Sequence, residues 1–298
     1  MAILCLGEAL VDLVCERPVA SLAEADGFVP HFGGATANVA VAAARAGAAV
    51  QLAGGAGDDA LGGWLRDRLT AAGVGLEWFE LVPGTATPLA LVWVDAAGEP
   101  SYQLYADAIG ATVTALAPRL EDAVTSCDAL FFGTNSMASD EEREVTMAAR
   151  DRALGLGRPV LFDPNVRMHR WPDGPAVAQA ANACIAGALL ARMNRAEAEL
   201  LTGEADPGRA ADALVAAGAR CVVVTLGAGG ALLRGEVEAD VAGVGASVRS
   251  SVGAGDAFTG VLLAALAAGG FDPAVLPGAL AVATRAGAAA TEHWGAGA

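Results

Sequence analysis

The 298-residue sequence predicts an α/β domain built on a mainly parallel β-sheet with helices on both faces. Short apolar runs rich in β-formers mostly end in glycine or aspartate; these are ILCLG (3–7), ALFFG (129–133), PVLFD (159–163) and CVVVTLG (221–227). Alanine-rich stretches with helical spacing lie between these runs. This alternation predicts right-handed β-α-β crossovers, and ligands of such sheets bind where the strands end.

Two segments interrupt the pattern, at about residues 13–32 and 85–107. The second alternates apolar and polar residues around a turn at Ala97-Gly98, and both segments are expected to be antiparallel. A small antiparallel sheet built from them could lie across the strand ends as a lid. A plain surface hairpin agrees equally well with the alternation. The simplest domain organisation is therefore a single domain, residues 1–298, that carries a lid.

Composition excludes several classes of function. A formal net charge of −16 opposes nucleic-acid binding, and no uninterrupted apolar segment is long enough to predict a membrane span. The N-terminus has no cationic region and reaches an acid at Glu8, so we expect a first strand and a cytoplasmic protein rather than a signal peptide. Five scattered cysteines favour neither disulfides nor structural zinc.

The sequence contains no lysine, since all 18 of its basic residues are arginine. This excludes a Walker A lysine, a Schiff-base lysine and a lysine general base. Any phosphate must therefore be bound by backbone amides, arginine or metal.

The segment SVGAGDAFTGVLLAAL (251–266) carries the strongest chemical signal, because a glycine-rich turn runs directly into an apolar helix. The amides of Gly253, Ala254 and Gly255 at a helix N-terminus would form an anion site for a phosphoryl group. Asp256 could be the helix N-cap or the base that accepts a proton from an attacking hydroxyl. The turn alone does not decide between these two roles.

A second glycine-rich entry to a helix lies in HFGGATANVAVAAARAG (31–47). Gly33 and Gly34, followed by Asn38, would offer backbone amides and a carboxamide to a polyhydroxy ligand. The alternative is a tight strand-to-helix turn with Asn38 capping the helix locally.

Together these motifs resemble both signatures of the ribokinase-like (PfkB) carbohydrate kinases, and the resemblance covers nearly the whole chain. GEALVD (7–12) looks like the first strand of the family, GGATANVA (33–40) like its first signature and GAGDAF (253–258) like its second. DPNVR (163–167) with Trp171 is similar to a stretch of the fructokinase and 2-keto-3-deoxygluconate kinase branches. NRAE (194–197) resembles the NxxE motif, and TLGAGGA (225–231) a nucleotide-binding strand end.

The resemblance implies a three-layer α/β/α fold and an ATP-dependent sugar kinase that uses Mg²⁺. Asp256 would be the catalytic base, with Gly253, Ala254 and Gly255 as the anion hole. Glu197 would hold the magnesium ion through water. The implied substrate-binding residues are Asp12, Gly33, Gly34, Asn38 and Arg167. The implied nucleotide-binding residues are Asn194, Thr225, Gly227, Gly230 and Thr284.

The sequence departs from the family pattern at three places. Ser250 stands where many members have an aspartate that helps to hold a monovalent cation, so we expect little potassium activation. Thr284 replaces a common asparagine on the adenine side. The segment YQLYAD (102–107) lacks the arginine that many fructokinases have after their lid tyrosine, so this segment does not identify which sugar is the substrate.

The expected acceptor is fructose or a related hexose or keto-sugar acid. The alternatives are a nucleoside kinase of the same fold and a non-catalytic sensor of sugar or nucleotide. Leu89, Leu91 and Trp93 alternate along one predicted strand, which favours a homodimer formed through the lid. Packing of these side chains onto the chain's own large domain is the alternative.

Overall fold

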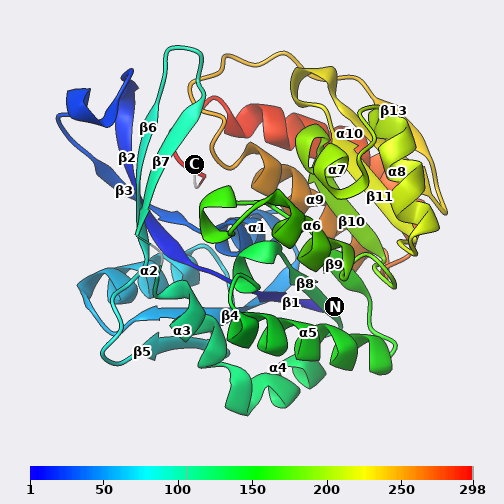
Figure 1. Ribbon diagram of the computed structural model, residues 1–298, viewed down its shortest axis with the longest axis horizontal. Helices are drawn as coiled ribbons and strands as arrows, with labels where there is room; N and C mark the ends of the chain where they lie inside the picture. Colours follow the sequence, from blue (N-terminus) through cyan, green and yellow to red (C-terminus); the bar gives the residue numbers. More distant parts are fainter. Residues whose placement is uncertain (106, 297–298) are drawn as a thin grey trace.

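The computed structural model describes residues 1–105 and 107–296, so that Ala106, within the predicted lid range, lies outside it. Among the described residues the larger sheet has nine strands in the order β13-β12-β11-β10-β9-β8-β1-β4-β5 (Figure 1). The strands from β11 to β5 in this order are parallel, and β12 and β13 add an antiparallel edge. The bounds are Ala2–Leu6 (β1), Ala49–Gly57 (β4), Phe79–Val82 (β5), Ala129–Phe132 (β8), Val160–Phe162 (β9), Leu190–Asn194 (β10), Cys221–Thr225 (β11), Ala231–Gly235 (β12) and Ala239–Val241 (β13).

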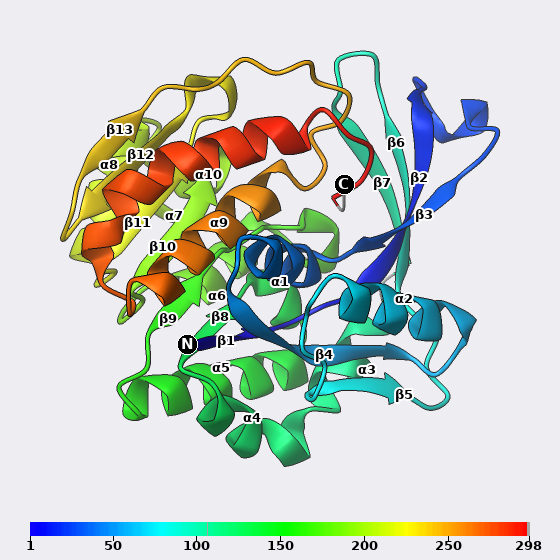
Figure 2. The same cartoon turned by 180° about the vertical axis from the view of Figure 1, so that it is seen from behind.

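Helices cover both faces of this sheet, which confirms the predicted α/β class (Figure 2). The side chains of β1 alternate between the two layers: Ile3 and Cys5 pack into one hydrophobic cluster, and Leu4 and Leu6 pack into the other. The first layer contains Ala35–Arg45 (α1), Ala60–Ala71 (α2), Ala254–Ala268 (α9) and Leu276–Ala290 (α10). The second contains Leu120–Ser126 (α4), Asp140–Gly155 (α5), Gly174–Asn182 (α6), Arg195–Thr202 (α7) and Pro207–Ala216 (α8).

A second, four-stranded sheet has the order β3-β2-β6-β7 and rises beside the start of α9 (Figure 2). Its strands are Leu10–Pro18 (β2), Val29–Gly33 (β3), Leu89–Val94 (β6) and Pro100–Tyr105 (β7). Each hairpin is antiparallel, as predicted, but β2 and β6 join the two hairpins as a parallel pair. Alternation within each segment could not show this long-range pairing. We call this sheet the lid sheet.

One face of the lid sheet is packed against the large domain. Leu10, Ala90 and Val92 cluster with Ile109 of α3 (Ile109–Thr114) and with Val252, which precedes α9. The three alternating apolar residues that the sequence predicted to share one face behave differently. Leu89 packs against the main core, whereas Leu91 and Trp93 stay partly exposed. The inward alternative therefore holds for Leu89.

The turn between β6 and β7 reaches the loop that precedes α9. The Gly98 carbonyl accepts a hydrogen bond of 2.9 Å from the Ser251 amide. Gly98 has φ +86°, and a Cβ there would lie 2.6 Å from Cγ1 of Val248. Glycine is thus required both by the backbone conformation and by the close approach.

None of the helices in residues 1–105 and 107–296 combines the length and the apolar character that crossing a membrane requires. All five cysteines are buried and unpaired.

Candidate active site

Helix α9 begins where the glycine-rich turn ends. Gly253, the N-cap residue, has φ +76°, and no side chain caps this helix end. Asp256 is the third residue of α9 and is only 6% exposed. Asp256 is therefore not the N-cap of α9, and its carboxylate is available for other contacts.

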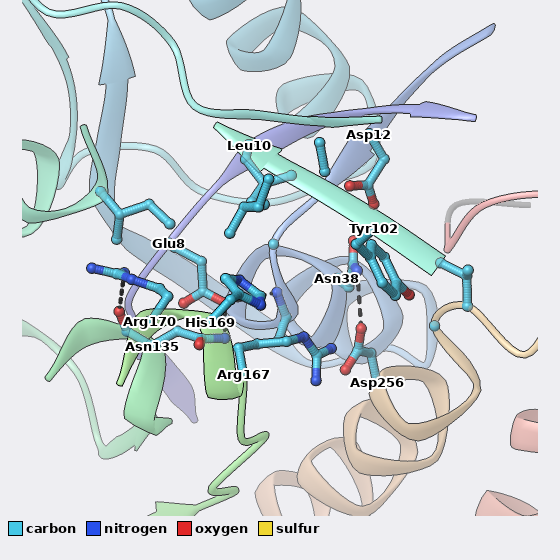
Figure 3. Close-up of a pocket in the computed structure, with 17 residues that line it drawn as sticks. Glu8, Leu10, Asp12, Asn38, Tyr102, Asn135, Arg167, His169, Arg170 and Asp256 are labelled. Atoms are coloured by element: carbon cyan, nitrogen blue, oxygen red, sulfur yellow. Dashed lines mark hydrogen bonds between the residues drawn. The ribbon is translucent and has the colours of Figure 1, made fainter. Parts of the chain in front are cut away.

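Two asparagines hold the Asp256 carboxylate, one at each oxygen. Asn38 Nδ2 donates to Oδ2 at 2.9 Å (Figure 3), and Asn165 Nδ2 donates to Oδ1 at 3.1 Å. Asn38 therefore reaches across to α9 instead of capping its own helix. Asn165 has φ +41°, a left-handed conformation that asparagine tolerates better than most residues. Both contacts fix the direction in which the carboxylate points.

The same pocket brings a second carboxylate, Asp12 of β2, close to Asp256. Burial raises the pKa of Asp12 to about 7, with Arg167 lowering it and Asp256 raising it. Burial also raises the pKa of Asp256 to about 6, against the hydrogen bond from Asn38 and the charge of Arg167. A carboxylate with a pKa near the operating pH is suited to general-base catalysis.

The pocket lies between the lid sheet and the carboxyl ends of the parallel strands (Figure 3). It brings together the sequence-predicted residues Asp12, Gly34, Asn38, Arg167, Gly253 and Asp256. It also contains side chains to which the sequence assigned no role, among them Glu8, Tyr102, Asn135, His169 and Arg170.

Gly33 and Gly34 occur where chain segments approach closely. A Cβ on Gly33 would lie 2.4 Å from Cγ of Asp12, so a side chain here would displace that carboxylate. Gly34 has φ +90°, and a Cβ there would lie 2.7 Å from the Glu8 carbonyl oxygen. Both glycines therefore shape the wall around Asp12.

Arg167 extends toward Asp256 and Tyr102 in the pocket (Figure 3). Its guanidinium donates to the neighbouring Val166 carbonyl at 3.3 Å. Arg170, in contrast, is committed to Glu142 at 2.7 Å and to the carbonyl of Asn135 at 2.5 Å. Arg167 makes fewer hydrogen bonds within the chain than Arg170 and so has more donors left for a ligand.

The amides at the start of α9, which the sequence predicted to form one anion site, differ in whether they already have an acceptor within the chain. The Ala254 amide donates to the Ser251 carbonyl at 3.3 Å. The amides of Gly255 and Asp256 lie in the first turn, where an α-helix leaves its N–H groups without intrahelical acceptors. These two amides are the better candidates for an anion site.

Asn194 and Glu197 lie outside this pocket and cap α7 reciprocally. Asn194 Oδ1 accepts from the Glu197 amide at 2.9 Å, and Glu197 Oε2 accepts from the Asn194 amide at 2.8 Å. Glu197 Oε1 also accepts from the Val166 amide at 2.8 Å. Burial, followed by the charge of Asp163, raises the pKa of Glu197.

The other residues assigned to the nucleotide also lie away from the pocket. Thr225 ends β11 and accepts a hydrogen bond from Arg192 at 2.9 Å. Gly227 and Gly230 have φ +57° and +97° in the turn that follows. The Thr284 hydroxyl donates to the Leu280 carbonyl in its own helix at 2.9 Å.

Sequence reasoning missed residues whose contacts span long distances along the chain. Glu8 accepts from the Ala35 amide, the Thr36 hydroxyl and Asn135 Nδ2. Asn165 was visible only as part of DPNVR. Arg192 did carry a signal, since it is a charged residue inside the apolar strand LARMN (190–194).

The chain is similar to known proteins over most of its length. Residues 2–298 match the model of the pfkB family carbohydrate kinases. The chain belongs to this family. Fructokinase-2 of Solanum lycopersicum is 31% identical over 263 residues, covering 88% of this chain and 80% of the relative.

Two solved structures of kinases are also similar to this pfkB-family chain. One is a double-mutant fructokinase from Vibrio cholerae O395 with fructose, ADP and potassium, at TM-score 0.86 and 27% identity, covering 99% of this chain and 94% of the other. The other is aminoimidazole riboside kinase from Salmonella enterica with its riboside and an ATP analogue, at TM-score 0.84 and 26% identity, covering 100% and 95%. The pfkB-family chain is thus a phosphotransferase that acts on a sugar hydroxyl.

Proposed function

We propose that this carbohydrate kinase transfers the γ-phosphoryl group of ATP to a hydroxyl of fructose or of a related hexose or keto-sugar acid. The observation that carries the proposal is the Asp256 carboxylate, held by Asn38 and Asn165 in a pocket at the start of α9. Phosphoryl transfer needs mainly in-line positioning and electrostatic stabilisation, which such a site can supply.

In the proposed reaction, Asp12, Asn38 and Arg167 orient the acceptor, with Gly33 and Gly34 forming the wall behind it. Asp256 takes the proton of the attacking hydroxyl as its oxygen bonds to the γ-phosphorus and the bond from that phosphorus to the bridging oxygen of the departing ADP breaks. The amides of Gly255 and Asp256, next to Gly253 and Ala254, stabilise the negative charge on the transferred group. The lid sheet excludes water from this step.

We assign ATP to the region of Asn194, Thr225, Gly227, Gly230 and Thr284. No group of three His, Cys, Asp or Glu among the described residues could hold a metal directly. Glu197 fits a water-mediated role, because each of its carboxylate oxygens retains a lone pair beside its backbone hydrogen bond and Mg²⁺ keeps much of its hydration shell. Bound magnesium would neutralise charge on the phosphate oxygens.

The acceptor is tested by ATP turnover with fructose, 2-keto-3-deoxygluconate, ribose, adenosine and aminoimidazole riboside. We expect the largest kcat/KM with fructose or the keto-sugar acid. Preference for a nucleoside would support the second candidate, a nucleoside kinase, which the similarity to aminoimidazole riboside kinase favours. Binding without turnover for all five compounds would support a sensor. The cytoplasmic location stays a prediction.

Potassium is expected to stimulate the reaction less than about tenfold, or ~1.4 kcal/mol of barrier, while a divalent ion is required. Ser250 is fully buried, and its hydroxyl accepts from the Val252 amide at 3.2 Å, so the loop lacks the carboxylate that many relatives place here. Initial rates in sodium, potassium and choline buffers at fixed magnesium measure the effect. A larger stimulation would mean that other groups rebuild a cation site.

We also propose a homodimer formed through the lid sheet, with Leu91 and Trp93 in the contact because both remain partly exposed. Trp93→Asp is expected to convert the dimer to a monomer with little loss of melting temperature. Light scattering across micromolar concentrations, with the exposed Val282→Asp on α10 as the matched variant away from the lid sheet, reports the change. A wild-type monomer would contradict the proposal.

A further inference from the structure

Arg192 lies in the middle of β10 with its side chain 8% exposed. The strand is an inner strand of the larger sheet, paired with β9 on one side and β11 on the other (Figure 1). A charged side chain here loses its hydration and must be compensated by partners within the protein. Its position therefore calls for a specific explanation.

The guanidinium of Arg192 connects both neighbouring strands. Nη1 donates to Oδ2 of Asp163, just after β9, at 3.0 Å, and Nη2 donates to Oγ1 of Thr225, at the end of β11, at 2.9 Å. The guanidinium carbon lies 5.5 Å from the ring centre of Phe258 on α9. Nε is buried without a hydrogen-bond partner in the described chain.

Arg192 also supports the turn from which α9 starts. A Cβ on Gly255 would lie 2.9 Å from Nη1 and 3.0 Å from Nη2, so the guanidinium lies directly against this glycine. Asp163 Oδ2, which accepts from Arg192, also accepts from the Thr259 hydroxyl of α9 at 2.9 Å. The first two turns of α9 are thus tied to β9 and β10.

The same carboxylate leads to the catalytic base. Asp163 Oδ1 accepts from the Asn165 amide at 3.2 Å, and the Asn165 side chain donates to Asp256. Asp163 is 2% exposed, so its charge has little solvent to screen it.

We propose that Arg192 is a positioning residue for phosphoryl transfer, which holds the Gly255 turn in place and neutralises Asp163, the carboxylate that Asn165 links to Asp256. The inference rests on the proposed function, because it takes Asp256 as the base and the Gly255 amide as part of the anion site. Arg192 acts through these groups without touching the acceptor.

Two separate effects follow from this arrangement. Loss of the guanidinium lets the Gly255 turn relax, which lowers the rate even when the base is fully ionised. Loss of its charge leaves Asp163 uncompensated, and a like charge near Asp256 favours its protonated form. The charged groups that act on Asp256 are Asp12 of β2, Arg167 and Asp163 after β9, and Arg192 of β10.

The test measures kcat and kcat/KM with ATP, Mg²⁺ and fructose from pH 5 to pH 9. Arg192→Gln is expected to lower the plateau kcat about 10- to 30-fold, less than the loss of a direct oxyanion donor. The acid limb of its pH–rate profile, where kcat falls as the base becomes protonated, should move about one pH unit upward, because the base stays protonated to higher pH. Arg192→Lys keeps the charge and should retain the wild-type acid limb with a smaller loss of plateau rate.

A double variant separates charge from position. Asp163→Asn with Arg192→Gln removes both charges, so the acid limb should return to the wild-type range while the plateau kcat stays low. Arg234→Gln is the matched control: its arginine pairs with Asp240 at the exposed edge of the sheet, and its plateau and limb should equal those of wild type. Melting temperature reports folding for every variant.

A purely structural role predicts a lower melting temperature with wild-type kcat and acid limb for the folded fraction of Arg192→Gln, and that result would overturn the inference. If Arg192→Gln does not fold, the double variant decides, since a wild-type plateau rate in it also overturns the proposal. If Asp256→Asn leaves turnover intact, the proposed function itself fails. Loss of turnover in Asp256→Asn with a wild-type profile in Arg192→Gln refutes only the role of Arg192.

Discussion

Asp256→Asn is expected to lower kcat by at least ~10²-fold with sugar saturating, the usual scale for loss of a general base. The asparagine keeps the size of the side chain. Asn38 and Asn165 each have a buried Oδ1 without a partner, so either can rotate to accept from the new amide. The fold and the affinity for ATP should therefore be retained.

The pH profile gives this prediction a second test. Asp256 must be ionised to accept a proton, and its pKa is raised to about 6 by burial. Wild-type kcat should therefore fall as pH falls through this value, and the residual rate of Asp256→Asn should not follow the same limb. Asp240→Asn, an exposed carboxylate on β13, is the matched control. Equal turnover in wild type and Asp256→Asn would refute the assignment of the base.

Asp12→Ala should lower kcat/KM for the sugar by about 10²- to 10³-fold, mainly through KM. Asp12 is 5% exposed on the pocket wall, where one carboxylate can accept hydrogen bonds from two hydroxyls. A hydrogen bond to a charged group contributes about 1.5–3 kcal/mol, so losing two bonds at the lower end of that range accounts for the expected change. Initial rates over a range of sugar concentrations measure the change, and ATP binding should remain near wild type.

Gly33→Ala provides an independent check on the acceptor site. It keeps Asp12 but places a methyl group 2.4 Å from the position of Cγ of that carboxylate, so the sugar KM should rise here too. Asp26→Ala is the control, because Asp26 is an exposed carboxylate that pairs with Arg17 beside the same hairpin. An unchanged sugar KM in Asp12→Ala would exclude Asp12 from the acceptor site.

The sequence predicted the parts of this molecule that depend on local signals. Apolar runs that end in glycine or aspartate mark parallel strands, and the glycine turn before Asp256 marks the start of α9, because both patterns reflect neighbouring residues. The parallel pairing of β2 with β6 could not be predicted from local patterns, since strand pairing depends on contacts between residues distant in sequence.

The residues of the candidate site likewise include some that local motifs identify and others that only long-range contacts reveal. Asp12, Asn38 and Asp256 were named from motifs, but their convergence joins residues far apart in the sequence, such as Asn38 and Asp256, which are 218 positions apart. Asn165 and Arg192 were missed because their roles arise from contacts with Asp256, Asp163 and Gly255. Asn194 and Glu197 show a further limit, since N-x-x-E also resembles a helix capping box and the structure contains that box.

Two of the buried carboxyl groups, Asp12 and Asp256, also affect the stability of the ligand-free protein. The pKa of Asp256 is about 6 in the folded chain against 3.8 for an ordinary aspartate, so the folded state binds this proton more tightly than the unfolded state does. Unfolding free energy therefore falls as pH rises from about 4 to about 6, with Asp256 alone costing about 3 kcal/mol at neutral pH. Asp12 acts in the same direction up to about pH 7. Mild acidity should thus stabilise the folded protein while it protonates the base and lowers the rate. A bound sugar that donates hydrogen bonds to these carboxylates should offset the same cost in stability at neutral pH.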